Sequence, residues 1–87
     1  MVKSHRELRT IAHEITRDWK NPSYTAQPYI RAMAELSDMK SKYYNDDAQD
    51  IVLRFLGNAT SWHGTVARRI KEELRQMLRD SGYKGIK

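Results

Sequence analysis

The sequence contains no cysteine, so neither a disulfide framework nor a thiolate zinc site is available to it. Its four glycines, at positions 57, 64, 82 and 85, form neither a phosphate-binding loop nor a dinucleotide-binding fingerprint. No apolar run approaches the roughly 20 residues that cross a bilayer, and residues 1–9 lack the apolar core of a signal peptide. We therefore expect a soluble, cytoplasmic protein.

The pattern of apolar residues predicts an all-α protein. A chain of 87 residues supports one hydrophobic core, so residues 1–87 are expected to form a single domain with a short flexible tail at 83–87. The alternation typical of strands is missing, and apolar residues recur every three or four positions instead. This period predicts a small bundle of four amphipathic helices at about residues 5–19, 26–37, 47–58 and 61–80, with a loop over 37–45.

Each predicted helix begins near a polar residue that can accept a hydrogen bond from the free amides of the first turn. Pro28 is expected in the first turn of the second helix, and Gly57 with Asn58 marks the end of the third. Trp62 is expected in the first turn of the last helix, on its buried stripe. The expected caps are Ser4 paired with Glu7 for the first helix, Thr25 for the second, Asn45, Asp46 or Asp47 for the third, with Asp46 and Gln49 at the spacing of a capping box, and Thr60 or Ser61 for the last.

The sequence offers no catalytic motif, cofactor site or metal site. His13 and Glu14 resemble part of the zinc protease motif, but Arg17 stands where the second histidine belongs. The acidic cluster of Asp46, Asp47 and Asp50 could hold magnesium or act in acid–base chemistry, but its place at a helix start explains it. We therefore expect a protein that is not an enzyme and needs no metal or cofactor.

The positive charge is concentrated in the last third of the chain. The net charge is +5, and residues 60–87 alone carry 7 basic and 3 acidic side chains. Four of the basic residues fall within a stripe of roughly 80° along the last helix, and arginine forks suit both carboxylate and phosphate groups. The stripe consists of Arg68, Lys71, Arg75 and Arg79.

The basic stripe leaves three interpretations open. It could be a solvated face paired locally with Glu72 and Glu73. It could bind a protein or nucleoprotein partner, since tyrosine and arginine are enriched at binding hot spots; the expected contacts are Arg68, Lys71, Arg75, Arg79, Tyr43 and Tyr44. Alternatively, the last two helices could form a loose helix-turn-helix that binds DNA or RNA; the contacts would then be Thr65, Arg68, Arg69, Lys71 and Arg75. A homodimer is a further alternative.

Four segments carry a resemblance to a group of known proteins. They are IAHEITRDWKNP, the proline and tyrosine that open the second helix, YYNDDAQDIVLRFL, and NATSWHGTVARRIKEEL. Together they resemble small uncharacterised proteins of bacteriophages and prophages over most of the chain. This resemblance implies a phage-associated helical protein in the host cytoplasm, and it brings no catalytic residues with it. Because small phage proteins often modify or block host machinery, it favours a non-enzymatic binder, such as an inhibitor of host defence or transcription complexes.

Overall fold

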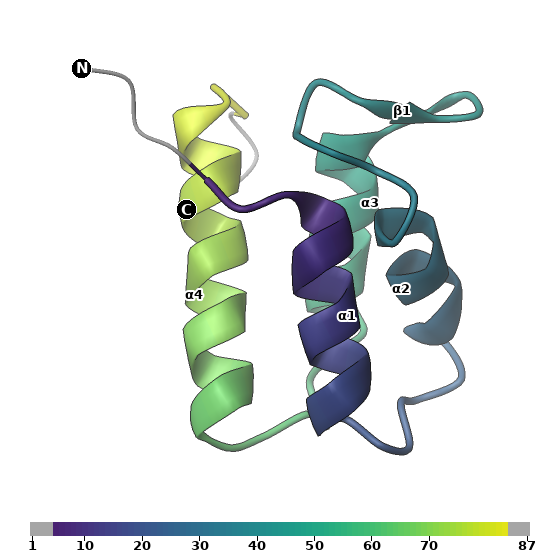
Figure 1. Cartoon of the computed structure of the whole chain (residues 1–87), viewed down its shortest axis with the longest axis vertical. Helices are drawn as coiled ribbons and strands as arrows, with labels where there is room; N and C mark the ends of the chain where they lie inside the picture. The colour runs from purple at the N-terminus through teal and green to yellow at the C-terminus, as the bar shows by residue number, and fades with distance from the viewer. Residues whose placement is uncertain (1–4, 84–87) are drawn as a thin grey trace.

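The computed structural model describes residues 5–83 and confirms a small, mostly helical bundle (Figure 1). Part of the expected C-terminal tail, residues 84–87, lies outside the described residues. A short hairpin precedes the third helix. The elements are α1 Leu8–Asp18, α2 Gln27–Met33, β1 Lys42–Tyr43, β2 Asp46–Asp47, α3 Ala48–Gly57 and α4 Thr65–Asp80.

The helices α1 and α3 form the middle of the bundle. Each of them contacts both α2 and α4, which lie on opposite sides (Figure 1). The helix α4 runs antiparallel to α1 and α3, so the start of α4 lies at the same end as the last turn of α3. The hairpin lies at the opposite end of the bundle, where α3 begins.

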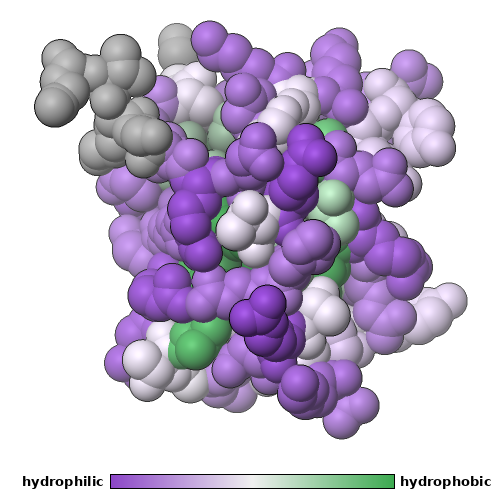
Figure 2. Space-filling model, in the orientation of Figure 1, coloured by the Kyte–Doolittle hydropathy of each residue, from purple (hydrophilic) through white to green (hydrophobic). Residues whose placement is uncertain are grey.

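The apolar stripes of all four helices meet in one core. The largest fully buried side chains are Phe55, Leu8, Ile11, Ile15, Met33, Ile70, Leu74, Leu78 and Val52. Among the described residues, no polar or charged residue is buried, and Tyr24 and Tyr44 are the large hydrophobic residues that remain exposed. The face seen in Figure 2 is mostly hydrophilic, with smaller hydrophobic areas visible between the hydrophilic side chains.

The start of α1 differs from its prediction because a neighbouring segment supplies the cap. The helix begins at Leu8 rather than at residue 5, and the Glu7 side chain makes no capping bond. Ser4, the other half of the expected capping box, lies outside the described residues. The amides of Leu8 and Arg9 instead donate to the carbonyls of Ser37 and Leu36, each at 3.0 Å. Because the chain must turn to present these carbonyls, α2 ends at Met33 and not at residue 37.

The predicted cap of α2 is also wrong. Ala26, not Thr25, is the capping residue, and no side chain bonds to the first turn. The carbonyl of Ser23 accepts from the amides of Ala26 and Gln27 at 3.0 and 3.2 Å. Pro28 lies in the first turn as predicted, where its missing donor costs little.

The hairpin contradicts the expectation that the chain contains no strand. In β1 and β2, Lys42 pairs with Asp47 and Tyr43 with Asp46, in antiparallel register. The hairpin also replaces the capping box expected at Asp46 and Gln49, because the amide of Ala48 donates to the carbonyl of Ser41 at 3.0 Å. The Gln49 side chain instead donates to the Ser81 hydroxyl at 2.8 Å.

The helix α4 begins at Thr65 rather than at residue 61, so Thr60 and Ser61 are not its caps. Its capping residue is Gly64, with φ 111° and ψ 179°. This region of backbone space is essentially restricted to glycine. Trp62 therefore precedes the helix, although it is buried as predicted, with 3% of its surface exposed.

We predict that Gly64→Ala destabilises the protein by about 1–3 kcal/mol, because alanine strains the backbone at this φ. Apart from its two chain neighbours, no atom lies within 4 Å of a Cβ built at Gly64, so a clash with the rest of the fold contributes nothing to this cost. Gly57→Ala is the matched control. It also meets no atom within 4 Å, and it lies in the last turn of α3 without a positive φ. It should stabilise by about 0.5–1 kcal/mol. Urea unfolding measures both, and equal effects of the two variants would contradict the backbone argument.

Candidate functional site

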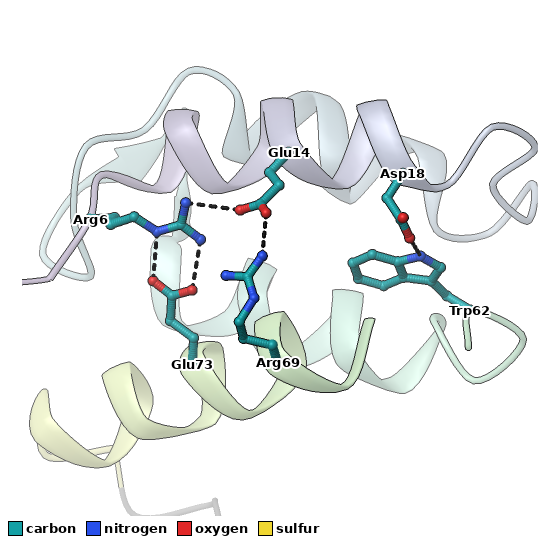
Figure 3. A network of polar contacts seen from close by, with 6 residues as sticks. All are labelled: Arg6, Glu14, Asp18, Trp62, Arg69 and Glu73. Atoms are coloured by element: carbon teal, nitrogen blue, oxygen red, sulfur yellow. Dashed lines mark hydrogen bonds and ion pairs between the residues drawn. The ribbon is translucent and has the colours of Figure 1, made fainter. Parts of the chain in front are cut away.

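Trp62 fixes the connection between α3 and α4. Its ring stacks on Trp19 with centroids 5.5 Å apart and planes at 9°, and it meets Phe55 edge-on at 6.3 Å. Its indole nitrogen donates to Asp18 Oδ2 at 2.9 Å (Figure 3). The connection is therefore held against both α1 and α3, although residues 58–64 are not helical.

Lys71 ties the same connection to α4. Its ammonium donates to the carbonyl of Trp62 at 2.7 Å and lies 5.9 Å from the centre of the Trp62 ring. Burial lowers the pKa of Lys71, and the charge of Arg75 lowers it further. Lys71 was expected to contact a partner, but its ammonium already has a structural role here.

Charged side chains on the inner side of α4 bind α1 and Arg6, which precedes it. Arg6 donates from Nε and Nη2 to both carboxylate oxygens of Glu73, at 2.9 and 2.7 Å (Figure 3). Its Nη1 lies 2.9 Å from Glu14 Oε1, as an ion pair without the alignment of a hydrogen bond. Arg69 binds the other oxygen of Glu14. The nucleic-acid interpretation included Arg69, but here its guanidinium is turned toward α1.

Glu14 is the member of this network whose protonation matters most. Burial opposes its ionisation, but the contacts with Arg6 and Arg69 and their positive charges outweigh burial and hold the pKa of Glu14 below its usual value. The folded state therefore binds the proton at Glu14 less readily than the unfolded state does.

The outer side of α4 presents the remaining arginines to solvent. Glu72 pairs with Arg75 at 3.7 Å and with Arg79 at 3.4 Å. Arg68 is exposed, and within residues 5–83 it forms no ion pair. Together with Lys71 and His63, Arg68 and Arg75 line a shallow hollow beside Trp62. This outer face, which we define as Arg68, Arg75 and Arg79, can bind carboxylate or phosphate groups.

The structure does not bring the two expected tyrosines beside Arg68. Tyr43 and Tyr44 lie in the hairpin, at the end of the bundle where α3 begins, whereas Arg68 lies in the first turn of α4 at the other end (Figure 1). The expected partner-binding set therefore divides into two separate surfaces, the outer face of α4 and the hairpin.

The last two helices differ from a helix-turn-helix in their geometry. That motif joins helices at about 90–120° through a turn of about 3–4 residues. Here α3 and α4 run antiparallel, and the longer segment 58–64 joins them (Figure 1). Thr65 is exposed at the start of α4, but a recognition helix would have to bind without the usual motif.

Sequence reasoning missed the contacts that α1 and the residues before it make with Trp62 and α4. The hydrogen bond between Asp18 and Trp62 spans 44 positions of the sequence, and that between Arg6 and Glu73 spans 67. No local spacing in the sequence reveals contacts over such separations.

Within the described part of the chain, no three metal-ligating side chains gather at one point. None of the helices there combines the length and hydrophobicity needed to cross a membrane. Comparisons with protein-family models, curated proteins and solved structures found no match to this chain.

We predict that Glu14→Gln makes the stability of the protein less dependent on pH in the acid range. Because the pKa of Glu14 is lowered by folding, its contribution is fully present above the unfolded pKa of about 4.3 and is lost as the pH falls through the lower folded pKa. The variant should be less stable than the wild type at pH 7 and should converge with it at low pH. Denaturant unfolding between pH 7 and pH 2 measures this.

The matched control is Glu35→Gln, at an exposed position that forms no ion pair within residues 5–83. It should leave the pH profile of stability close to that of the wild type. A Glu14→Gln profile parallel to the wild-type profile would contradict the proposed role of Glu14.

Proposed function

We propose that this protein is a non-enzymatic binding protein that docks on an acidic surface of a protein or nucleoprotein complex through the outer face of α4. The observation that carries the proposal is a difference between the two sides of that helix: charged side chains on one side are bound within the fold, and arginines on the other side face solvent. Arg69 binds Glu14 of α1 and Glu73 binds Arg6, which precedes α1, whereas Arg68 is exposed and forms no ion pair within residues 5–83. Arg75 and Arg79 both pair with Glu72, at 3.7 and 3.4 Å, and Arg79 makes a further contact.

Because of their position, these arginines can bind a partner with only a small loss of backbone conformational entropy. They project from a helix whose buried side packs into the core, so their backbone is already placed before a partner arrives. Each guanidinium can give two parallel hydrogen bonds to a carboxylate. A partner that covers the hollow would also exclude water from these contacts and strengthen them.

The contacts of the groups with lowered pKa values support a binding role rather than catalysis. Catalytic acids and bases usually carry strongly perturbed pKa values inside a cleft. The carboxylate and amine with lowered pKa values, Glu14 and Lys71, are instead bound to partners that hold the fold together. The resemblance to small phage proteins adds the nature of the partner, which we propose to be part of the defence or transcription machinery in the host cytoplasm.

We predict that the double variant Arg68→Glu, Arg75→Glu loses the partner, because charge reversal turns attraction into repulsion. The measurement is a quantitative pull-down from bacterial lysate with the tagged chain. The control is Lys20→Glu, Arg31→Glu, which changes the net charge equally at exposed positions outside α4. It should retain the partner, and thermal unfolding should show both variants folded. Retention of every partner by the α4 variant would refute the proposal.

Nucleic-acid binding is the second candidate, favoured by the exposed Thr65 and Arg68 in the first turn of α4. It predicts an affinity that falls with salt, with a logarithmic slope of about 0.9 per phosphate neutralised on duplex DNA. Arg68→Gln removes one positive charge and should then reduce the magnitude of that slope by about 0.9. A fluorescence anisotropy titration with labelled duplex and single-stranded DNA at several salt concentrations measures this. Absence of binding at low salt would eliminate this candidate.

A further inference from the structure

The turn of the hairpin places a tyrosine in a backbone conformation that penalises it. Tyr44 and Asn45 connect β1 to β2, and Tyr44 has φ 57°. Two-residue hairpin turns require a positive φ at the first central residue, and glycine, asparagine or aspartate normally occupies such a position. An L-residue with a larger side chain meets the following carbonyl there, at a cost in stability.

The packing of Tyr44 does not account for its presence. Its side chain is 85% exposed, and its ring meets that of the neighbouring Tyr43 edge-on, with centroids 4.7 Å apart. A ring so exposed buries little surface against the rest of the fold. Tyr43 is half-buried and limits the directions that the Tyr44 ring can take. The turn therefore presents an aromatic ring to solvent at a position where asparagine would suit the backbone better.

The charges beside the ring indicate which kind of molecule can meet it. Asp47 lies 3.7 Å from Lys42, whereas Asp46 is exposed and has no ion pair within the described residues. A free carboxylate beside Tyr44 repels phosphate, which disfavours both nucleic acid and anionic lipid. The same carboxylate attracts arginine or lysine, and exposed tyrosine is typical of protein-binding hot spots.

We propose that the hairpin tip, defined as Tyr43, Tyr44 and Asp46, is a second protein-binding surface, separate from the outer face of α4. The ring of Tyr44 enters an apolar pocket of a partner protein, and a basic side chain at the rim of that pocket pairs with Asp46. The backbone strain at Tyr44 is then retained because the ring contributes to binding, as strained residues at functional sites commonly do.

The first test compares Tyr44→Asn with Tyr24→Asn. Tyr24 is an equally exposed tyrosine, at 87%, and its φ is not positive. Asparagine tolerates the left-handed conformation, so Tyr44→Asn should raise the midpoint of thermal unfolding by several degrees, whereas Tyr24→Asn should leave it nearly unchanged. Equal shifts for the two variants would overturn the claim that tyrosine is strained in the turn.

The second test measures binding with the same pair of variants. Proteins captured from bacterial lysate by the wild-type chain are purified and titrated against each variant. Tyr44→Asn should weaken binding about tenfold or more, Asp46→Asn should weaken it less, and Tyr24→Asn should leave it unchanged. A photoreactive phenylalanine derivative at position 44 should cross-link directly to the partner.

The proposal is overturned if Tyr44→Asn retains every captured protein, if the wild-type chain captures none, or if position 44 cross-links to nucleic acid. Capture alone does not support it, because only a loss specific to Tyr44 identifies the hairpin tip. The variant Arg68→Glu, Arg75→Glu leaves the hairpin unchanged. The α4 proposal and the hairpin proposal are therefore tested by different variants, and the failure of one can be distinguished from the failure of the other.

Discussion

The packing of Trp62 is the contact on which the rest of the structure depends. Its ring lies against Trp19 and Phe55, its indole nitrogen binds Asp18, and its carbonyl accepts from Lys71. One residue between two helices is thus bound to α1, α3 and α4. Because aromatic rings bury large areas, this contact fixes a connection that has no regular secondary structure of its own. Gly64 then supplies the backbone conformation from which α4 can begin.

The orientation that Trp62 imposes on α4 determines which charged side chains of that helix face α1 and which face solvent. The side facing α1 carries Arg69 and Glu73, which complete an alternating network with Arg6 and Glu14 (Figure 3). The opposite side carries the arginines of the outer face. A rotation of α4 about its own axis would exchange these two sets. The structural network therefore also determines which arginines are available to a partner.

The sequence predicted the helices well and their beginnings poorly, for one physical reason. Periodicity reports burial, so the stripe through Ile70 and Leu74 and the burial of Trp62 could be predicted. Helix caps were predicted from local side chains, but carbonyls from distant segments satisfy the first amides of α1. The division of the arginines between structure and surface likewise depends on contacts with α1 across many positions. The hairpin was missed because its strands have two residues each and a tyrosine occupies the strained turn position.

Hydrogen exchange of the Trp62 indole proton tests the central claim most directly. A buried and hydrogen-bonded indole in a rigid connection should exchange only when the whole domain unfolds, with an opening free energy equal to the global free energy of unfolding. It should then be as protected as the amides of Ile70 and Leu74. An indole proton that exchanges within minutes while those amides stay protected would show that the connection opens on its own. That result would contradict the claim that Trp62 sets the position of α4.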